Sequence, residues 1–350
     1  MADPKRSNVF IVGAGASTNF GLPVGENLKL EIGRLLDFQP SRAGFGEFGD
    51  NLLKRTLSHV GTVREYGLSY PDLLRAAQET SSAMTIAPTI DNWIHKNRNY
   101  DEFVLVGKLA IARVLSMAER SSPLFVKDDN IYRMLDYNNV GGSWLAGLAT
   151  QMLTGSDFDD FIQSLSNITF ITFNYDRCIE QFFLWLARIY FGEVDNADKR
   201  TLDALEVIHV YGSLGDLDTT FGPRTGYGCD LDIHGLLQAS EKIHTFTQGV
   251  SEENIRVRIH DALSNCEVLT ILGFGFDRIN FDLLPNQRLE ACQRLIVTTR
   301  GHSRDDLQTI KEGLHERLGV EPSYNALNAS DVFKEYRQFF LGKFNSSPTA

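Results

Sequence analysis

The segment of residues 8–21 limits the fold more than any other part of this sequence. It opens with the apolar run of residues 9–12, which is typical of a strand buried on both faces of a parallel sheet. Small residues follow at once, and they let the backbone turn tightly and approach a ligand closely: Gly13, Ala14, Gly15, Ala16 and Ser17. A helix is predicted over residues 26–37, where leucine and isoleucine recur at helical spacing.

This strand, turn and helix together predict a phosphate site, because backbone N–H groups and a helix N-terminus favour an anion. Thr18 stands where the usual dinucleotide fingerprint has its third glycine. The small residues 13–17 are therefore candidates for cofactor binding. An ordinary connection between a strand and a helix of an α/β core is the alternative interpretation.

The composition is that of a globular protein, and it narrows the class of partner. The 350 residues are enough for one large domain or two smaller ones, with 43% hydrophobic and 23% charged residues. A net charge of −11 opposes a broad nucleic-acid surface, which needs a basic patch. No apolar run approaches the roughly 20 residues that span a bilayer, and the first residues lack the apolar core of a signal peptide. We therefore expect a cytoplasmic protein with no membrane partner and no direct nucleic-acid partner.

The cysteines give no sign of a metal site. Cys178, Cys229, Cys266 and Cys292 lie far apart in the sequence and form no CxxC pair, which opposes a structural zinc ribbon. We expect no metal, and we interpret the cysteines as scattered buried thiols in a reducing compartment.

Predicted strands alternate with helices in the rest of the chain, and this alternation indicates a mainly parallel sheet. Strands are predicted at residues 168–173, 206–211, 268–272 and 295–298, and helices at residues 304–318 and 330–341. The predicted fold class is α/β, a Rossmann-like parallel sheet with helices on both faces and a helical insertion. We assign residues 1–40 and 166–300 to the nucleotide-binding domain, residues 41–165 to the insertion, and residues 301–350 to C-terminal helices that are a candidate assembly surface.

Each predicted strand ends in residues that suit a ligand crevice, which open α/β sheets form outside the carboxyl ends of their strands. The first ends in GAGAS, the second in NYD, the third in HVYGS, the fourth in GFGFD and the fifth in TT. The candidate residues at the later ends are Asn174, Asp176, Gly212, Gly273, Phe274 and Thr299. Their recurrence at successive strand ends predicts a nucleotide site.

These motifs resemble those of the sirtuin-like NAD-binding domain: GAGAS followed by GLP, then NYD, then a strand into GS, then GFGFD. The resemblance covers residues 8–35 and 165–300, together with the insertion. In the insertion, APTIDNWIHKNRN and the long helix after it are similar to the version in bacterial antiphage defence proteins.

The resemblance implies hydrolysis of NAD. Most sirtuins carry a zinc ribbon, and this chain lacks the ribbon's cysteine pairs, so there is less reason to expect an acyl-peptide cleft. The defence branch of the family hydrolyses NAD, and the chain is therefore expected to be an NAD glycohydrolase (NADase) with NAD as its substrate. Cleavage to nicotinamide and ADP-ribose would deplete NAD in abortive infection, a form of antiviral defence.

Asn174 and Asp176 are the residues of the NYD motif that carry the expected chemistry. The Asn174 amide can hold a water or a ribose hydroxyl by hydrogen bonds, and a helix N-cap is its alternative role. Asp176 matches the nicotinamide-contacting aspartate of the family. Its alternative role is to complement the dipole at the first turn of a helix.

The third strand end departs from the sirtuin pattern. Sirtuins place their catalytic histidine directly before the glycine, where this chain has Tyr211, and His209 stands two residues earlier. Residues two apart on a strand point to the same face, so we predict His209 as the general base and Tyr211 as a contact to NAD. A core histidine is the alternative for His209. The departure at Tyr211 favours a second hypothesis, a non-catalytic sensor module that binds NAD or ADP-ribose.

Partners are inferred from the same resemblance. A freely active NAD hydrolase would kill its host, so we expect a homo-oligomer controlled by a further defence subunit, of which a HerA-type ATPase is one known kind. A nicotinamide-dependent oxidoreductase is disfavoured, because no acidic ribose ligand stands ~20 residues after the glycine turn. Asp37 is the nearest candidate, and it lies at the end of the first predicted helix.

Overall fold

The computed structural model describes residues 7–38, 48–127, 135–154, 156–217, 226–244, 253–284, 286–325, 327–340 and 344. The chain divides into two compact units. Unit 1 consists of Met1–Phe20, Pro123–Val210 and Val250–Ala350, and unit 2 consists of Gly21–Ser122 and Tyr211–Gly249.

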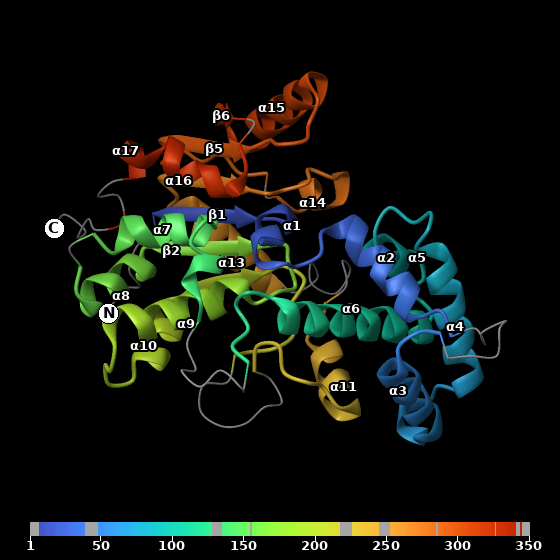
Figure 1. Cartoon of the computed structure of the whole chain (residues 1–350). Helices are drawn as coiled ribbons and strands as arrows, with labels where there is room; N and C mark the ends of the chain where they lie inside the picture. Colours follow the sequence, from blue (N-terminus) through green and yellow to red (C-terminus); the bar gives the residue numbers. More distant parts are fainter. Residues whose placement is uncertain are drawn as a thin grey trace. The chain divides into compact units, whose positions relative to one another are not determined.

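Unit 1 is built on one parallel sheet of six strands in the order β3-β2-β1-β4-β5-β6 (Figure 1). The strands are β1 (Asn8–Val12), β2 (Ile168–Thr172), β3 (Glu206–His209), β4 (Val268–Leu272), β5 (Arg294–Thr298) and β6 (Pro322–Asn325). This is the strand order of the doubly wound dinucleotide-binding fold, and the direction of winding reverses between β1 and β4. The predicted Rossmann-like α/β class is confirmed.

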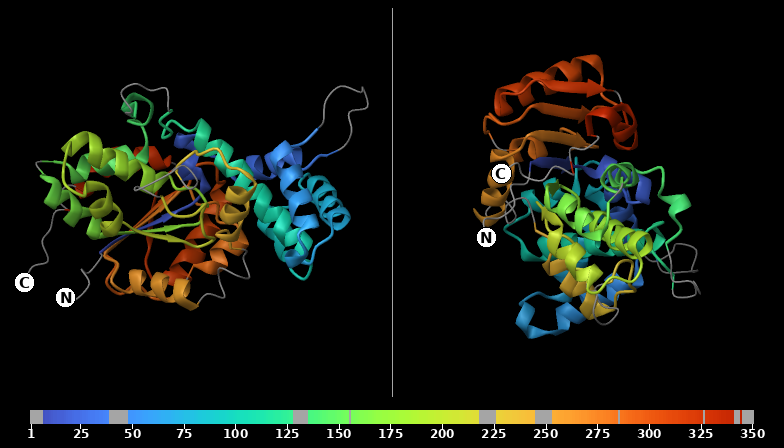
Figure 2. Two further views of the ribbon diagram at one scale, coloured as in Figure 1. Left: turned by 90° about the horizontal axis from the view of Figure 1, so that it is seen from below. Right: turned by 90° about the vertical axis from the view of Figure 1, so that its left-hand side faces the viewer.

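The central strands are apolar because helices cover both faces of the sheet (Figure 2). Every residue of β1, β2 and β4 is buried. On one face, the Phe10 ring stacks on Phe170 of β2 at 5.5 Å and lies 6.4 Å from Trp144 and 6.1 Å from Phe333. These contacts join two strands to two helices from distant parts of the chain, and they form the centre of the core of unit 1.

The helices of unit 1 connect and flank the strands. They are α1 (Ala14–Ser17), α7 (Trp144–Met152), α8 (Phe158–Ser166), α9 (Cys178–Phe191), α10 (Ala197–Ala204), α13 (Glu253–Ser264), α14 (Arg278–Leu283), α15 (Arg304–Leu318), α16 (Val332–Glu335) and α17 (Arg337–Phe340). Short 3-10 turns occur at η1 (Thr18–Phe20), η3 (Tyr137–Asn139) and η4 (Ala329–Asp331). α8 packs on β2, α13 on β3 and α15 on β6.

Unit 2 is helical in the residues that the structure describes. Its helices are α2 (Gly25–Leu35), α3 (Asn51–Thr62), η2 (Arg64–Tyr66), α4 (Tyr70–Ala83), α5 (Ile90–Lys96), α6 (Asp101–Ser121) and α11 (Ile233–Glu241). The long helix α6 packs against α2, α4 and α11.

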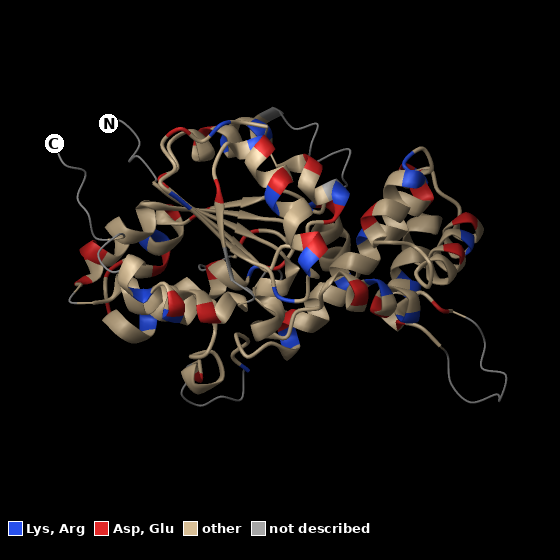
Figure 3. Cartoon of the chain, turned by 90° about the horizontal axis from the view of Figure 1, so that it is seen from above, with Lys and Arg blue, Asp and Glu red and all other residues tan. Residues whose placement is uncertain are grey.

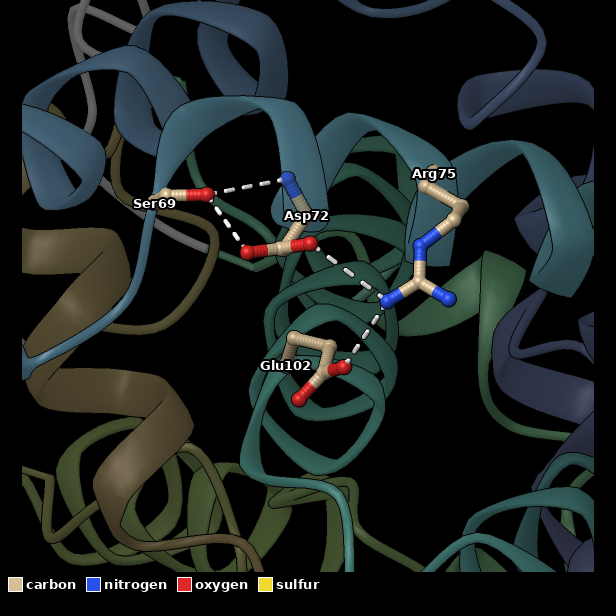
Figure 4. A network of polar contacts seen from close by, with 4 residues as sticks. All are labelled: Ser69, Asp72, Arg75 and Glu102. Carbon is tan, nitrogen blue, oxygen red and sulfur yellow. Dashed lines mark hydrogen bonds and ion pairs between the residues drawn. The ribbon is translucent and has the colours of Figure 1, made fainter.

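A polar network links α4 to α6 at the surface of unit 2 (Figure 4). The Ser69 hydroxyl caps α4 by accepting from the N–H of Asp72 at 3.3 Å, and it donates to the Asp72 carboxylate at 2.6 Å. Arg75 donates to Asp72 at 3.5 Å and to Glu102 of α6 at 3.3 Å. Arg75 is more than half exposed, so these ion pairs contribute at most about 1 kcal/mol each and the apolar face of α6 holds the helices together.

The structure differs from the sequence prediction at the third strand and near the C-terminus. β3 ends at His209, two residues before the predicted end. β6 was not predicted, because it is a four-residue strand that begins with Pro322 and carries little apolar signal. The helix predicted over residues 330–341 is instead a series of short turns, η4, α16 and α17.

The boundaries of the two units also differ from the predicted domain boundaries. Residues 123–165 belong to the sheet unit, whereas the prediction placed them in the insertion, and residues 211–249 belong to the helical unit. Packing explains the first difference, because Trp144 of α7 lies against Phe170 of β2 and α8 packs on the same strand.

Charged side chains lie on the helices and connecting segments, and β1, β2 and β4 carry none (Figure 3). Within the described ranges, no helix has the length and apolar character required to cross a bilayer.

Candidate functional site

The turns after β1 and β4 meet where the direction of winding reverses, which is where doubly wound folds bind ligands. The Gly13 N–H donates to the carbonyl of Leu272 at 2.9 Å, and the Gly15 N–H donates to the carbonyl of Gly273 at 2.9 Å. The Ala16 N–H donates to the carbonyl of Gly13, also at 2.9 Å. Three N–H groups that the sequence led us to expect on a diphosphate therefore bind protein carbonyls instead. Contact between this turn and a ligand remains a prediction.

The glycines of these turns are required by their contact with each other. A Cβ on Gly13 would lie 2.6 Å from the carbonyl oxygen of Gly273, and one on Gly15 would lie 2.9 Å from the same atom. Gly273 has φ +57, and a Cβ there would lie 2.2 Å from the nitrogen of Ala16. The sequence predicted small residues for the approach of a ligand, but the structure shows the approach of another turn.

We expect Gly273→Ala to lower the free energy of unfolding by at least about 2 kcal/mol. The left-handed conformation costs an alanine about 1–2 kcal/mol, and the clash with the turn after β1 adds about 1–3 kcal/mol. Urea unfolding followed by circular dichroism measures the change.

Gly275→Ala is the matched control for this substitution. Apart from its chain neighbours, no atom of the described residues lies within 4 Å of a Cβ at Gly275, so the effect of this substitution should stay within about 0.5 kcal/mol. Equal stability of the Gly273→Ala and Gly275→Ala proteins would contradict the close contact of the two turns.

Asn174 follows β2 and reaches the turn after β1. Its side-chain N–H groups donate to the carbonyl of Gly13 at 3.1 Å and to the hydroxyl of Ser17 at 2.8 Å. Its Oδ1 atom is buried and has no hydrogen-bond partner among the residues that the structure describes, and the residue is only 6% exposed. A buried acceptor without a partner costs about 1–3 kcal/mol, and such an atom in a native structure calls for an explanation. A ligand or water that donates to Oδ1 would supply one.

The alternative role predicted for Asn174 is wrong. The N-cap of α9 is Arg177, three residues further on, and Asn174 takes no part in capping that helix. The amide is held by Gly13 and Ser17, which follow β1, the strand next to β2. Its free oxygen therefore has a fixed position at the carboxyl edge of the sheet.

Asp176 is buried next to Asn174, and Ser17 links the two. The Ser17 hydroxyl hydrogen-bonds the Asp176 carboxyl, which also accepts from the N–H of Cys178 at 3.2 Å. Burial raises the pKa of Asp176 above its ordinary value, although the hydrogen bonds from Ser17 and Cys178 oppose the shift. The contact with Cys178, the first residue of α9, matches the alternative predicted for Asp176 at a helix start.

His209 lies at the end of β3, and protein acceptors occupy both of its ring nitrogens. Nδ1 is 3.2 Å from the backbone carbonyl oxygen of Asn174, and Nε2 is 2.7 Å from Oε1 of Glu180. A carbonyl oxygen and an ionised carboxylate can only accept, so with Glu180 ionised each ring nitrogen carries a proton. The arrangement thus favours an imidazolium at His209.

The electrostatics of the pair agree with this assignment. Burial opposes the charged imidazole, but the charge and hydrogen bond of Glu180 outweigh it, so the pKa of His209 lies above its ordinary 6.5. Burial likewise opposes the Glu180 carboxylate, but the charge of His209 and its hydrogen bond outweigh that effect, so the pKa of Glu180 lies below its ordinary 4.5. His209 has no free lone pair here, and this geometry opposes the predicted role of a general base.

Glu180 is a site residue that the sequence analysis missed. It lies in the first turn of α9, four residues after Asp176, and its Oε2 atom is buried with no hydrogen-bond partner among the described residues. Its contact with His209 joins two different elements, so no spacing within one element signalled it. Acidic residues are common in the first turn of a helix, so Glu180 did not stand out as a partner of His209.

The remaining candidates lie in two places. Phe274 is buried after β4, with its ring edge-on to Phe173 at 4.9 Å. Thr299 is buried directly after β5. Tyr211 and Gly212 belong to unit 2, where the Tyr211 carbonyl accepts from the N–H of His244 at 2.9 Å. The structure thus groups Asn174, Asp176 and His209 with the turn after β1, and Tyr211 does not continue the strand beyond His209 as predicted.

Comparisons with known proteins give no family for the chain. No protein-family model matches the sequence, and no curated protein matches it. In the part of the chain that the structure describes, no group of three or more His, Cys, Asp or Glu residues could hold a metal ion.

Proposed function

We propose that the chain is an NAD glycohydrolase that cleaves NAD to nicotinamide and ADP-ribose. The observation that carries the proposal is the buried Oδ1 of Asn174, which has no partner in the described part of the chain and lies at the carboxyl edge of a doubly wound sheet. The sequence resemblance to the sirtuin-like NAD-binding domain supports the choice of NAD among nucleotides.

To cleave NAD, the protein has to position the substrate and stabilise the charge that develops on it. Breaking the bond between nicotinamide and ribose develops positive charge on the ribose, and water then attacks the sugar. Oδ1 of Asn174 can accept from a ribose hydroxyl or from that water, and its negative partial charge favours the developing cation. Asp176, raised in pKa by burial, is the nearby group that can exchange a proton with the substrate.

His209 serves as a positioning residue in this scheme. Its imidazolium donates to the backbone carbonyl of Asn174 and is held by Glu180. It thereby fixes the segment that presents the Asn174 amide. The attacking water then needs no strong base, because the ribosyl cation is itself a strong electrophile.

A second function, a non-catalytic sensor of NAD or ADP-ribose, is favoured by one observation. His209 offers no free lone pair, and the sirtuin position for a catalytic histidine is Tyr211. A site of this kind can bind a nucleotide without turning it over. Asn174 would then hold the ribose alone.

Purified full-length protein incubated with NAD distinguishes the two functions. Chromatography follows the release of nicotinamide, and calorimetry on the same sample follows the binding of NAD and ADP-ribose. Release of nicotinamide supports the glycohydrolase, and binding without release supports the sensor. Absence of both would overturn the assignment of the site.

The biological setting is part of the same proposal. Depletion of NAD would serve antiphage defence in the cytoplasm, and control by self-assembly or by a HerA-type ATPase subunit would keep the resting enzyme inactive. The sequence resemblance supports this setting. Measuring nicotinamide release across a range of protein concentrations tests control by self-assembly.

A further inference from the structure

Two of the scattered cysteines lie together at the amino ends of adjacent strands. Cys266 stands two residues before Val268 of β4, and Cys292 stands two residues before Arg294 of β5. Val268 and Arg294 are register partners, so the two cysteines occupy matching places before neighbouring strands. Both are free thiols, and each shifts the pKa of the other. The expectation that the thiols are scattered is wrong for this pair.

The spacing between the two strands permits a covalent bond. Neighbouring strands lie about 4.7–4.9 Å apart, and Cα atoms joined by a disulfide lie about 4.4–6.8 Å apart. A backbone hydrogen bond holds the two segments together next to the cysteines, because the N–H of Gln293 donates to the carbonyl of Glu267 at 2.8 Å. The two sulfur atoms can therefore join without a rearrangement of the sheet.

The two thiols have different exposure and acidity. Cys266 is fully buried, and the hydrogen bond to Cys292 together with burial raises its pKa. Cys292 is partly exposed, and the hydrogen bond from Cys266 lowers its pKa. An accessible thiol of lowered pKa beside a buried thiol is the arrangement of an oxidation-sensitive pair. Cys292 can meet an oxidant in the solvent, and Cys266 can only react with Cys292.

We propose that Cys266 and Cys292 form a redox pair that hydrogen peroxide converts to a disulfide. The Cys292 thiolate attacks one oxygen of the peroxide, the O–O bond breaks, and a sulfenic acid and hydroxide result. The Cys266 sulfur then attacks the Cys292 sulfur, the S–O bond breaks, and the hydroxyl leaves as water with the proton of Cys266. Two thiols lose two electrons in total, and one peroxide becomes two waters.

The bond would link the starts of β4 and β5, whose opposite ends carry Gly273 and Thr299. It would close the segment of residues 266–292 into a covalent loop, which restrains the unfolded chain. This pair lies outside the proposed NAD site, so the inference does not depend on the proposed function.

Peptide mapping of the oxidised protein tests the proposal. The folded full-length protein is treated with hydrogen peroxide, it is unfolded in denaturant that contains the alkylating reagent so that buried thiols are blocked as they become exposed, and it is digested without reductant. We expect a linked peptide that contains Cys266 and Cys292 and that separates on addition of a reductant. Alkylated Cys292, or Cys292 oxidised to sulfinic acid without the linked peptide, would overturn the proposal.

Two variants define the specificity of the reaction. Cys292→Ser should abolish the linked peptide, whereas the matched control Cys229→Ser, at another partly exposed cysteine, should retain it in full. In Cys266→Ser, the sulfenic acid at Cys292 has no resolving partner and should accumulate as an adduct of a sulfenic-acid reagent. A linked peptide of unchanged yield in Cys292→Ser would contradict the assignment.

Discussion

The Asn174→Ala protein is expected to release nicotinamide from NAD at least about a hundredfold more slowly than the parent. Loss of one preorganised polar group that stabilises a transition state typically costs about a hundredfold to a thousandfold in turnover. Among the described residues of this site, two side-chain oxygens are buried without a partner, Oδ1 of Asn174 and Oε2 of Glu180. Oδ1 of Asn174 is the one that we expect to contact the substrate. Single-turnover measurement of nicotinamide release checks the rate.

A matched control separates this effect from a loss of folding. Asn167 lies just before the same strand at its opposite end, and its side chain donates to the carbonyl of Phe344 at 3.3 Å. Asn167→Ala removes a comparable hydrogen bond and should cleave NAD at the parent rate. Thermal unfolding of both variants shows whether each remains folded. Parent-like turnover by a folded Asn174→Ala protein would refute the role of Asn174.

The His209→Gln protein is expected to lose about 3–5 kcal/mol of unfolding free energy near pH 6. Removing one member of a buried ion pair leaves the other charge buried and unpaired, and this costs about 3–5 kcal/mol. The side chains of His209 and Glu180 are only 13% and 17% exposed, so water cannot replace the lost partner fully. Urea unfolding followed by fluorescence measures the change.

The pH dependence of this loss follows from the two shifted pKa values. Because the pKa of His209 is raised, its contribution is fully present below about its ordinary 6.5 and is lost as pH rises through the raised value. Because the pKa of Glu180 is lowered, its contribution is present above about its ordinary 4.5 and is lost as pH falls through the lowered value. The difference between parent and variant should therefore be largest between these two pH values.

A double variant isolates the pair from its surroundings. Glu180→Gln alone should also destabilise the protein, because it leaves a buried imidazolium near Arg177. Glu180→Gln combined with His209→Gln removes both charges, and it should cost less than the sum of the two single losses. Additive losses, or a loss independent of pH, would show that the two side chains do not form an ion pair in solution.

The central strands could be predicted from the sequence because strands that are buried on both faces are mostly apolar. β1, β2 and β4 consist mostly of apolar residues, with only asparagine and threonine among them, and burial on both faces favours such strands. The end of β3 was harder to place, because Val210 and Tyr211 continue the apolar run into a turn. The pattern of apolar residues gives the existence of a strand but not the residue at which its hydrogen bonds stop.

The polar contacts of the site could be predicted only in part. The NYD motif located Asn174 and Asp176 at the edge of the sheet, and the structure places both there. The partner of His209 is Glu180, which comes from a different element, and no periodicity within one element reveals such a pair. The same limit applies to Cys266 and Cys292, which are adjacent only because β4 pairs with β5. Contacts between elements depend on strand order, which the sequence alone left open.

The division of unit 1 into three separate segments of the chain affects how a new molecule is made. β1 is synthesised first, but its neighbour β4 begins at Val268, so a growing chain on the ribosome cannot complete the sheet until most of it has been translated. The N–H groups of Gly13 and Gly15 can form their hydrogen bonds only after Leu272 and Gly273 have been synthesised. A product that stops before Leu272 would therefore carry Asn174 and the turn after β1, but it would lack the carbonyls of Leu272 and Gly273 that bind this turn.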